Sequence, residues 1–159
     1  MSTPALLLTT KLYLPPARPN LVTRPRLIER LKEGLARPLT LVSAPAGFGK
    51  TTLVTDWLNR AERPFTWLAL DESDNDPARF LAYFVAALQK IDPAIGQATQ
   101  AMLQSLSRQP PPPEAILTSL INDIAATPRP FVLILDDYHL IHTLPIHQQL
   151  AFLLEHQPP

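Results

Sequence analysis

A ten-residue stretch in the first third of the chain combines a glycine-containing loop with a lysine and two hydroxyl side chains. It runs Ser-Ala-Pro-Ala-Gly-Phe-Gly-Lys-Thr-Thr from Ser43 to Thr52. Gly47 and Gly49 can adopt backbone angles that other residues avoid, so consecutive N–H groups can point into one hollow. Lys50 adds a full positive charge, and Thr51 offers a hydroxyl oxygen to a metal ion. This order of residue types predicts a phosphate-binding P-loop.

The predicted ligand of this loop is a polyphosphate with Mg²⁺, because amides and a lysine attract phosphate oxygens while a threonine hydroxyl can bind the metal. The residues expected to contact this ligand, which the family resemblance described below implies is ATP, are Ala46, Gly47, Phe48, Gly49, Lys50, Thr51 and Thr52. The usual pattern begins with glycine, whereas this chain has Ala44 there, which can serve if its φ is negative. The alternative interpretation is a glycine-rich turn before a surface helix, in which Lys50 is merely solvated.

A strand and a helix must flank such a loop, and the hydrophobic pattern predicts both. The apolar run that leads in predicts a first core strand at Leu39–Ser43. After the loop, apolar residues recur with helical spacing at Leu53, Val54, Trp57 and Leu58. The first turn of this helix, near Lys50, adds unpaired N–H groups and the positive end of the helix dipole.

A second candidate site is an acidic pair that follows a continuous apolar run. Phe131–Leu135 reads Phe-Val-Leu-Ile-Leu and precedes Asp136 and Asp137, which is the form of a Walker B strand. Asp136 is the predicted magnesium ligand beside Thr51. Asp137 is predicted to orient or deprotonate the attacking water, with Lys50 offsetting phosphate charge as the other catalytic residue. The alternative is an acidic loop that simply ends a strand.

Apolar runs that alternate with helical patterns predict an α/β fold, a P-loop NTPase-like parallel sheet flanked by helices. Phe65–Leu70 is the remaining predicted strand, and Asp76-Pro77 is a typical helix start. Ligands of such sheets bind beyond the carboxyl ends of the strands. The loop at Ala44–Thr52, Asp71 and the acidic pair at Asp136 are all predicted to lie there.

The start of the chain is predicted to be separate from this domain. Pro15 and Pro16 disfavour a helix, so residues 1–20 are interpreted as an extended N-terminal arm. Residues 21–159 form the predicted P-loop domain, which begins with a helix candidate at Thr23–Leu35.

Composition excludes several classes of protein. Fourteen basic and fourteen acidic side chains cancel, which argues against a strong electrostatic grip on nucleic acid. The chain has no cysteine, so disulfides and thiol catalysis are excluded and a cytoplasmic location is compatible. No apolar run approaches the roughly 18 residues of a membrane span.

His139 and His142 are three apart, but without further ligands a polar role in a loop is favoured over a metal site. His147 and His156 are predicted to lie on the exposed part of the last helix.

Several longer motifs resemble those of one family. They are Thr10-Lys11-Leu12 with its trailing prolines, Leu21-Val22-x-Arg24-x-Arg26-Leu27, Ser43–Thr52, Trp67–Pro77 (Trp-Leu-Ala-Leu-Asp-Glu-Ser-Asp-Asn-Asp-Pro), Leu133–His139 and Phe152–His156. Together they resemble the start of the MalT-like transcription regulators, which are large ATP-binding proteins with a LuxR-type DNA-binding end. These regulators belong to the STAND class of P-loop ATPases. The resemblance covers nearly the whole chain, and Trp67–Pro77 is its most specific part.

The resemblance implies a molecular switch in which ATP favours a self-associating active form and ADP a resting form. It also implies that Ala44 is usual at the first loop position. In related STAND proteins the segment before the loop contacts adenine, which implies that Leu21 and Val22 are cofactor-binding residues.

The sequence departs from this family after Pro159. The family's ATPase part continues with a strand that carries a sensor residue and lies between the strands ending at Ala44 and Asp136. We therefore expect a fragment or a truncated reading frame with an incomplete sheet, weak or absent ATP hydrolysis and no direct DNA binding. The alternatives are a non-hydrolysing protein-interaction module, which would bind a partner or a second copy, and a small P-loop kinase.

Overall fold

The computed structural model describes residues 6–104 and 111–158. The chain divides into two units, each described here by itself. The first, which we call the sheet unit, consists of Met1–Tyr13 and Pro64–Pro158. The second, which we call the loop unit, is Leu14–Arg63. The chain therefore enters the sheet unit, leaves it for the loop unit and returns.

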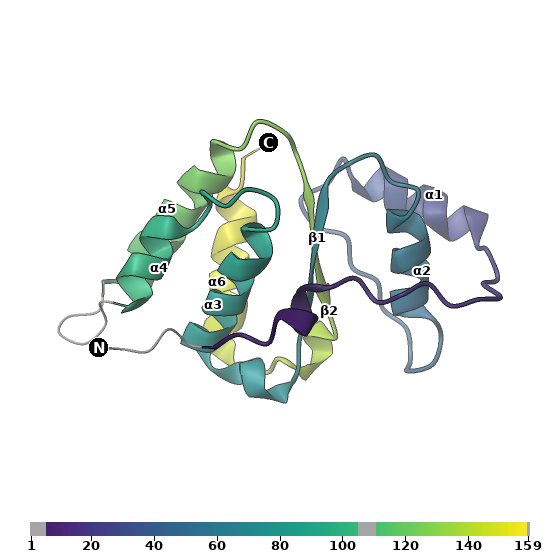
Figure 1. Ribbon diagram of the computed structural model, residues 1–159, viewed down its shortest axis with the longest axis horizontal. Coiled ribbons are helices and arrows are strands. Elements are labelled where there is room, and N and C mark those ends of the chain that lie inside the picture. Colours follow the sequence, from purple (N-terminus) through teal and green to yellow (C-terminus); the bar gives the residue numbers. More distant parts are fainter. Residues whose placement is uncertain (1–5, 105–110, 159) are drawn as a thin grey trace. The chain divides into compact units, whose positions relative to one another are not determined.

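The sheet unit contains two parallel strands, as predicted. β1 (Phe65–Ala69) pairs with β2 (Val132–Asp136), and the register places Ala69 opposite Asp136. The helices are α3 (Pro77–Leu88), α4 (Gln97–Gln104), α5 (Pro113–Ala125) and α6 (Leu144–His156), and all four lie on one side of the strands (Figure 1). Leu68, Val85 and Leu120 are fully buried in the core between these layers. The structure is thus the expected incomplete P-loop NTPase-like α/β fold, with two of the sheet's strands formed.

Proline and a capping carboxylate explain where the helices of this unit begin. The Asp76 side chain accepts a hydrogen bond from the Arg79 backbone N–H at 2.7 Å and caps α3. Pro77 then occupies the first turn, where a missing N–H is harmless. α5 and α6 also carry proline in their first turn. With Pro25 of the loop unit, four of the chain's 19 prolines therefore lie in the first turn of a helix that the structure describes.

The loop unit contains two helices, α1 (Pro25–Gly34) and α2 (Lys50–Leu58). Ile28 and Leu31 of α1 are buried, as are Trp57 and Leu58 of α2. Both helices match the predicted ones, and Pro25 occupies the first turn of α1.

The strand predicted at Leu39–Ser43 is not formed. These residues have no strand assignment, and Leu39 and Leu41 are 60% and 80% exposed. A strand needs a neighbour that pairs with its N–H and C=O groups. Among residues 6–104 and 111–158 the only strands, β1 and β2, pair with each other. An apolar run predicts the tendency to form a strand, but the partner has to come from elsewhere.

The predicted N-terminal arm is not extended throughout its described part, residues 6–20. A 3-10 helix, η1, spans Thr9–Leu12, and Lys11 and Leu12 are buried in the sheet unit. The prolines at 15 and 16 restrict only their own neighbourhood, so the turn before them is free to form. Contacts with β1 and with the acids after it hold this turn.

Candidate functional site

The predicted phosphate loop has the backbone geometry that its glycines were expected to supply. Gly47 and Gly49 have φ of 82° and 75°, in the left-handed region. In the described part of the chain the only other residues with positive φ are Asn20, Asp137 and Gly96, so Ala44 has the negative φ that alanine tolerates. A Cβ placed on Gly47 would meet nothing within 4 Å, so the space next to this residue is open.

The N-terminus of α2 is the second part of this half of the site. Gly49 is its N-cap, no side chain caps it by a hydrogen bond, and its first turn carries no acid. Backbone N–H groups in such a turn attract an anion. The Lys50 ammonium donates to the carbonyl oxygens of Ala44 at 2.6 Å and Pro45 at 3.3 Å. The lysine is therefore folded back over the loop.

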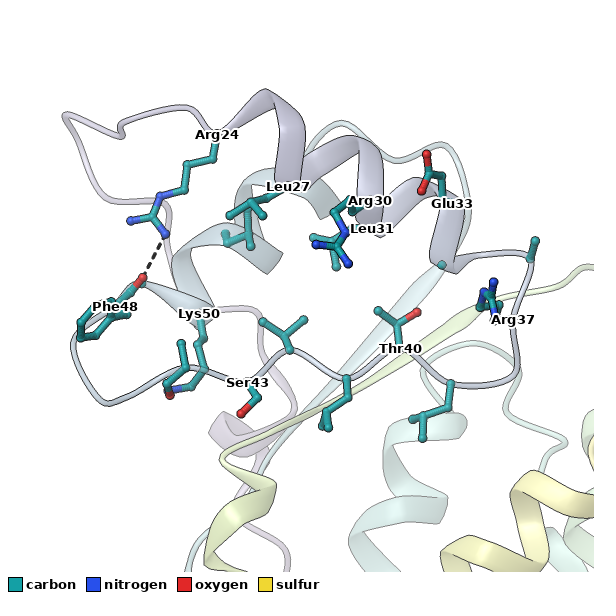
Figure 2. A pocket seen from close by; sticks show the side chains of 18 residues that line it. Arg24, Leu27, Arg30, Leu31, Glu33, Arg37, Thr40, Ser43, Phe48 and Lys50 are labelled. Carbon is teal, nitrogen blue, oxygen red and sulfur yellow. Dashed lines mark hydrogen bonds between the residues drawn. The ribbon is translucent and has the colours of Figure 1, made fainter.

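The segment before α1 also reaches the loop. Arg24 donates from Nη1 to the Phe48 carbonyl at 3.1 Å, the dashed line in Figure 2. A hollow of about 190 Å³ lies between this segment and α2, lined by Arg18, Asn20, Leu21, Val22, Arg24, Gly49, Thr52, Leu53 and Asp56. Leu21 and Val22 thus line one hollow with Gly49 and Thr52, and their role toward adenine stays a prediction.

A larger hollow of about 870 Å³ lies along the unpaired segment 39–44. In Figure 2, Leu27 and Leu31 point from α1 toward this segment, while the ring of Phe48 points away from the hollow. Phe48 is 60% exposed. Leu39, Leu41 and Val42, which were expected to form a core strand, are among the residues that line this hollow.

Charge is distributed unevenly between the units, although the whole chain is neutral. Leu14–Arg63 contains nine basic and four acidic side chains, whereas the remaining residues contain five basic and ten acidic ones. The net charge is thus +5 for the loop unit. A net positive charge on the unit that carries the loop favours a polyanionic ligand.

The acidic pair lies in the sheet unit at the end of β2. The Leu70 N–H donates to the Asp136 carbonyl at 3.0 Å and extends the strand pairing to the last residue of β2. Asp136 Oδ1 accepts from the Asp137 N–H at 3.1 Å. Asp137 is exposed and has φ of 56°, an unusual angle for a residue other than glycine. The two acids thus lie at the carboxyl end of β2, and their roles toward the metal and the water stay predictions.

The two halves of the predicted site belong to different units. Residues 46–52 lie in the loop unit, and Asp136 and Asp137 lie in the sheet unit. The magnesium site predicted from Thr51 and Asp136 therefore stays a prediction. In the described ranges no group of three or more His, Asp or Glu side chains gathers as a metal site.

Sequence reasoning missed an ion-pair network built on Lys11. Its ammonium contacts Asp71 at 2.7 Å and also pairs with Asp74, which is fully buried. Arg79 contacts Asp74 at 3.3 Å, and both cations lie over the ring of Tyr83. Lys11 and the two acids come from two of the motifs that carried the family resemblance. That shared origin was the signal available in the sequence.

The same network changes two pKa values. The Lys11 hydrogen bond, with help from Ser73, lowers the pKa of Asp71 to about 2. Burial alone would lower the pKa of Lys11, but its hydrogen bonds to Asp71 and Asp74 together raise it. Asp71 lies beyond the carboxyl end of β1, as predicted, and there pairs with Lys11.

The prediction that His147 is exposed is wrong. His147 is half-buried, and its Nδ1 lies 2.5 Å from the Tyr138 hydroxyl. Burial also raises the pKa of Tyr138. The tyrosine directly after the acidic pair provides a partner that helical spacing alone did not reveal.

Comparisons with known proteins agree with this fold. The sequence profile of the AAA ATPase domain matches residues 20–159. The chain is 37% identical over 153 residues to the HTH-type transcriptional regulator MalT of Cronobacter sakazakii and to that of Klebsiella pneumoniae. It is 39% identical over 153 residues to MalT of Serratia proteamaculans. Each match covers 96% of this chain but only 17% of the relative.

The resemblance to MalT-like regulators is thereby confirmed for the aligned region. No helix in the described residues has the length and hydropathy that a membrane span requires. The matched profile covers well over half of the chain and includes both the phosphate loop and the acidic pair. The chain therefore belongs to the AAA ATPase domain family, whose members bind nucleotides.

Proposed function

We propose that this chain is an ATP- and magnesium-binding module of a signal-responsive transcriptional regulator and that it acts as a nucleotide-dependent switch. The observation that carries the proposal is the left-handed glycine loop that leads into the uncapped first turn of α2. The net positive charge of the loop unit supports a triphosphate ligand. The matched range, residues 20–159, supports a nucleotide-binding domain at 21–159. Transcriptional regulation is taken from the names of the relatives.

Each residue of the proposed site has a separate role. The amides of residues 46–52 hold the phosphates. On binding, the Lys50 ammonium gives up its hydrogen bonds to the loop carbonyls and donates to phosphate oxygens. Leu21 and Val22 contact the base. Thr51 and Asp136 fit magnesium because hydroxyl and carboxylate oxygens are its preferred protein ligands. When bound, the metal offsets the charge of the phosphates.

Asp137 is the proposed group that orients the attacking water. Its carboxylate is exposed, so its oxygens are accessible to a water molecule. We propose weak or absent hydrolysis, because Leu39–Ser43, which leads into the loop, lacks a strand partner among the described residues. Such a segment holds the loop loosely, and catalysis needs closely fixed geometry.

The test is calorimetric titration of the chain with ATP and Mg²⁺. Lys50→Ala should weaken ATP binding about 100-fold, since it removes a charge-assisted contact with phosphate. Lys32→Ala is the matched control, because Lys32 is an exposed lysine of the same unit that pairs only with Glu29 in the structure. Unchanged ATP affinity in Lys50→Ala would refute the proposal.

A second candidate function is a protein-interaction module that does not hydrolyse nucleotide. It is favoured by the exposed apolar side chains of Leu39 and Leu41, which lie on a segment without a strand partner among the described residues. A second copy could cover them. Light scattering separates the two functions, since assembly that ATP does not change supports interaction and assembly that needs ATP supports the switch.

A further inference from the structure

Asn75 connects the segment after β1 to the segment after β2 in the sheet unit. Its Oδ1 accepts from the backbone N–H groups of His142 at 2.8 Å and Thr143 at 3.2 Å. Its Nδ2 donates to the Leu140 carbonyl at 2.9 Å and the Glu72 carbonyl at 3.1 Å. The Thr143 hydroxyl adds bonds to the Asn75 carbonyl at 2.8 Å and to its Oδ1 at 3.0 Å.

These partners require an asparagine amide. Two backbone N–H groups on one side need an acceptor, and two carbonyl oxygens on the other side need a donor. A carboxylate at this position would set an oxygen against the carbonyls of Leu140 and Glu72. Because the contacts reach 65 to 68 residues along the chain, Asn75 fixes tertiary geometry and not only its own turn.

The acidic turn is therefore attached to the chain after β1 at both of its ends. Before the turn, the Leu70 N–H bonds to the Asp136 carbonyl. After it, Asn75 holds the residues from Leu140 to Thr143. The short piece between these attachments contains Asp137 and the 3-10 helix η3 (Tyr138–Leu140).

This double attachment constrains the backbone at Asp137. Its φ of 56° is left-handed, a conformation that is uncommon for residues other than glycine, although Asn and Asp adopt it more readily than most. Strain of this kind persists when the surroundings over-determine the backbone, and it gathers at functional sites. The φ of Asp137 sets where its carboxylate points, so the contacts that fix this angle also orient the carboxylate.

We propose that Asn75 is a positioning residue that holds the Asp136–Asp137 turn in the geometry required to handle magnesium. This inference rests on the proposed function. Asn75 acts through the backbone of residues 140–143 and needs no contact with the nucleotide. It also gives a role to the asparagine in the Trp67–Pro77 motif, to which the resemblance assigned none.

The experiment compares the wild-type chain with Asn75→Ala by two measurements. The first is hydrogen exchange of the amides of Asp137, Leu140 and Ile141, all of which donate bonds within the turn. The second is ATP affinity with Mg²⁺ and with EDTA. Asn75→Ala should speed exchange about tenfold or more. It should remove most of the affinity that Mg²⁺ adds, while the affinity in EDTA stays unchanged.

Two control variants separate positioning from simple destabilisation. Asn122→Ala makes the same change on an exposed face of α5. Thr66→Val removes a buried 2.6 Å hydrogen bond to the Ala87 carbonyl and lowers stability away from the turn. Both variants should keep the affinity gain from Mg²⁺.

The outcomes distinguish the two proposals. A wild-type chain that binds no ATP under either condition refutes the proposed function, and the role of Asn75 falls with it. A wild-type gain from Mg²⁺ that persists in Asn75→Ala refutes the positioning role alone. Faster amide exchange in Asn75→Ala together with an unchanged affinity gain from Mg²⁺ also refutes the positioning role, because Asn75 would then only stabilise the fold.

Discussion

The loop unit and the sheet unit present their candidate residues on very different supports. In the loop unit, the phosphate loop and the segment before it are exposed or half-buried, and the side chains of Leu39 and Leu41 are 60% and 80% exposed. In the sheet unit, the acidic turn follows a strand beside a core that includes the fully buried Leu68, Val85 and Leu120. The main hydrophobic cluster draws all of its members from the sheet unit.

This difference indicates where ligand binding can have the larger effect. The sheet unit holds its geometry with buried apolar contacts and bonded polar groups. In the loop unit, fewer buried side chains support an open loop of backbone amides. A ligand that binds only the folded state stabilises it by mass action, and the gain shows most where the unliganded structure is weakest. We expect nucleotide to slow hydrogen exchange mainly in the loop unit.

The largest expected effect comes from breaking the Lys11 network of the sheet unit. Lys11→Met leaves the fully buried carboxylate of Asp74 with Arg79, at 3.3 Å, as its remaining cationic partner. Removal of one member of a buried ion pair typically costs about 3–5 kcal/mol, and the Arg79 contact places the expected loss near the lower end of that range. Urea unfolding at neutral pH should show a loss of this size in the free energy of unfolding.

A matched lysine tests whether burial is the reason. Lys32 pairs with Glu29 at 2.7 Å, but both side chains are more than half exposed. Lys32→Met should therefore change stability by less than about 0.5 kcal/mol. Equal losses for Lys11→Met and Lys32→Met would contradict the claim that the sheet unit depends on its buried charges.

The next effect compares one glycine from each unit. Gly96 of the sheet unit has φ of 74°, and an added Cβ would lie 2.5 Å from Cγ1 of the fully buried Val85. Gly96→Ala should therefore cost about 3 kcal/mol, from overpacking and backbone strain together. Gly47→Ala has similar strain but no clash, so it should cost about 1 kcal/mol. Thermal unfolding of both variants measures the difference.

A larger loss of stability in Gly47→Ala than in Gly96→Ala would contradict the view that the sheet unit is closely packed and the phosphate loop is open. If Gly47→Ala destabilised the chain more than Gly96→Ala, the phosphate loop would be packed and not open. We expect Gly47→Ala to weaken ATP binding more than Gly96→Ala does, since only Gly47 belongs to the proposed phosphate-binding loop.

Local sequence patterns predicted those features that local physics decides. Asp76 and Pro77 start α3 because a capping carboxylate followed by proline suits a first turn anywhere. Gly47 and Gly49 adopt the left-handed angles for which glycine alone carries no penalty. The run Val132–Asp136 forms a strand because a parallel partner, β1, is present.

The sequence could not predict features that depend on distant partners. Leu39–Ser43 has the composition of a strand, but its backbone has no strand to pair with among the described residues. Lys11 and Asp74 are 63 residues apart, and Asn75 and Thr143 are 68 apart. Nothing in either local pattern identifies the other member of the pair. Only their shared presence in recognisable motifs pointed to a role.

The smallest expected effect is the pH dependence that Asp71 adds to the sheet unit. Its hydrogen bond to Lys11 is the main cause of the drop in its pKa from 3.8 to about 2. A carboxyl whose folded-state pKa is lowered stabilises the fold above its unfolded pKa, and this contribution is lost as the pH falls from about 4 through 2. Because the side chain is 52% exposed, solvent screening limits the contribution to about 1 kcal/mol or less.

The variant Asp71→Asn isolates this contribution because asparagine does not titrate. Urea unfolding at pH 6, 4, 3 and 2.5 should give a wild-type advantage in free energy of unfolding that is largest at pH 6 and shrinks toward pH 2.5. The other acids titrate in both proteins and cancel in the difference. A difference that stays constant over this range would mean that the Asp71 carboxylate gains nothing from Lys11, and the sheet unit would then depend on Asp74 alone to hold the N-terminal turn.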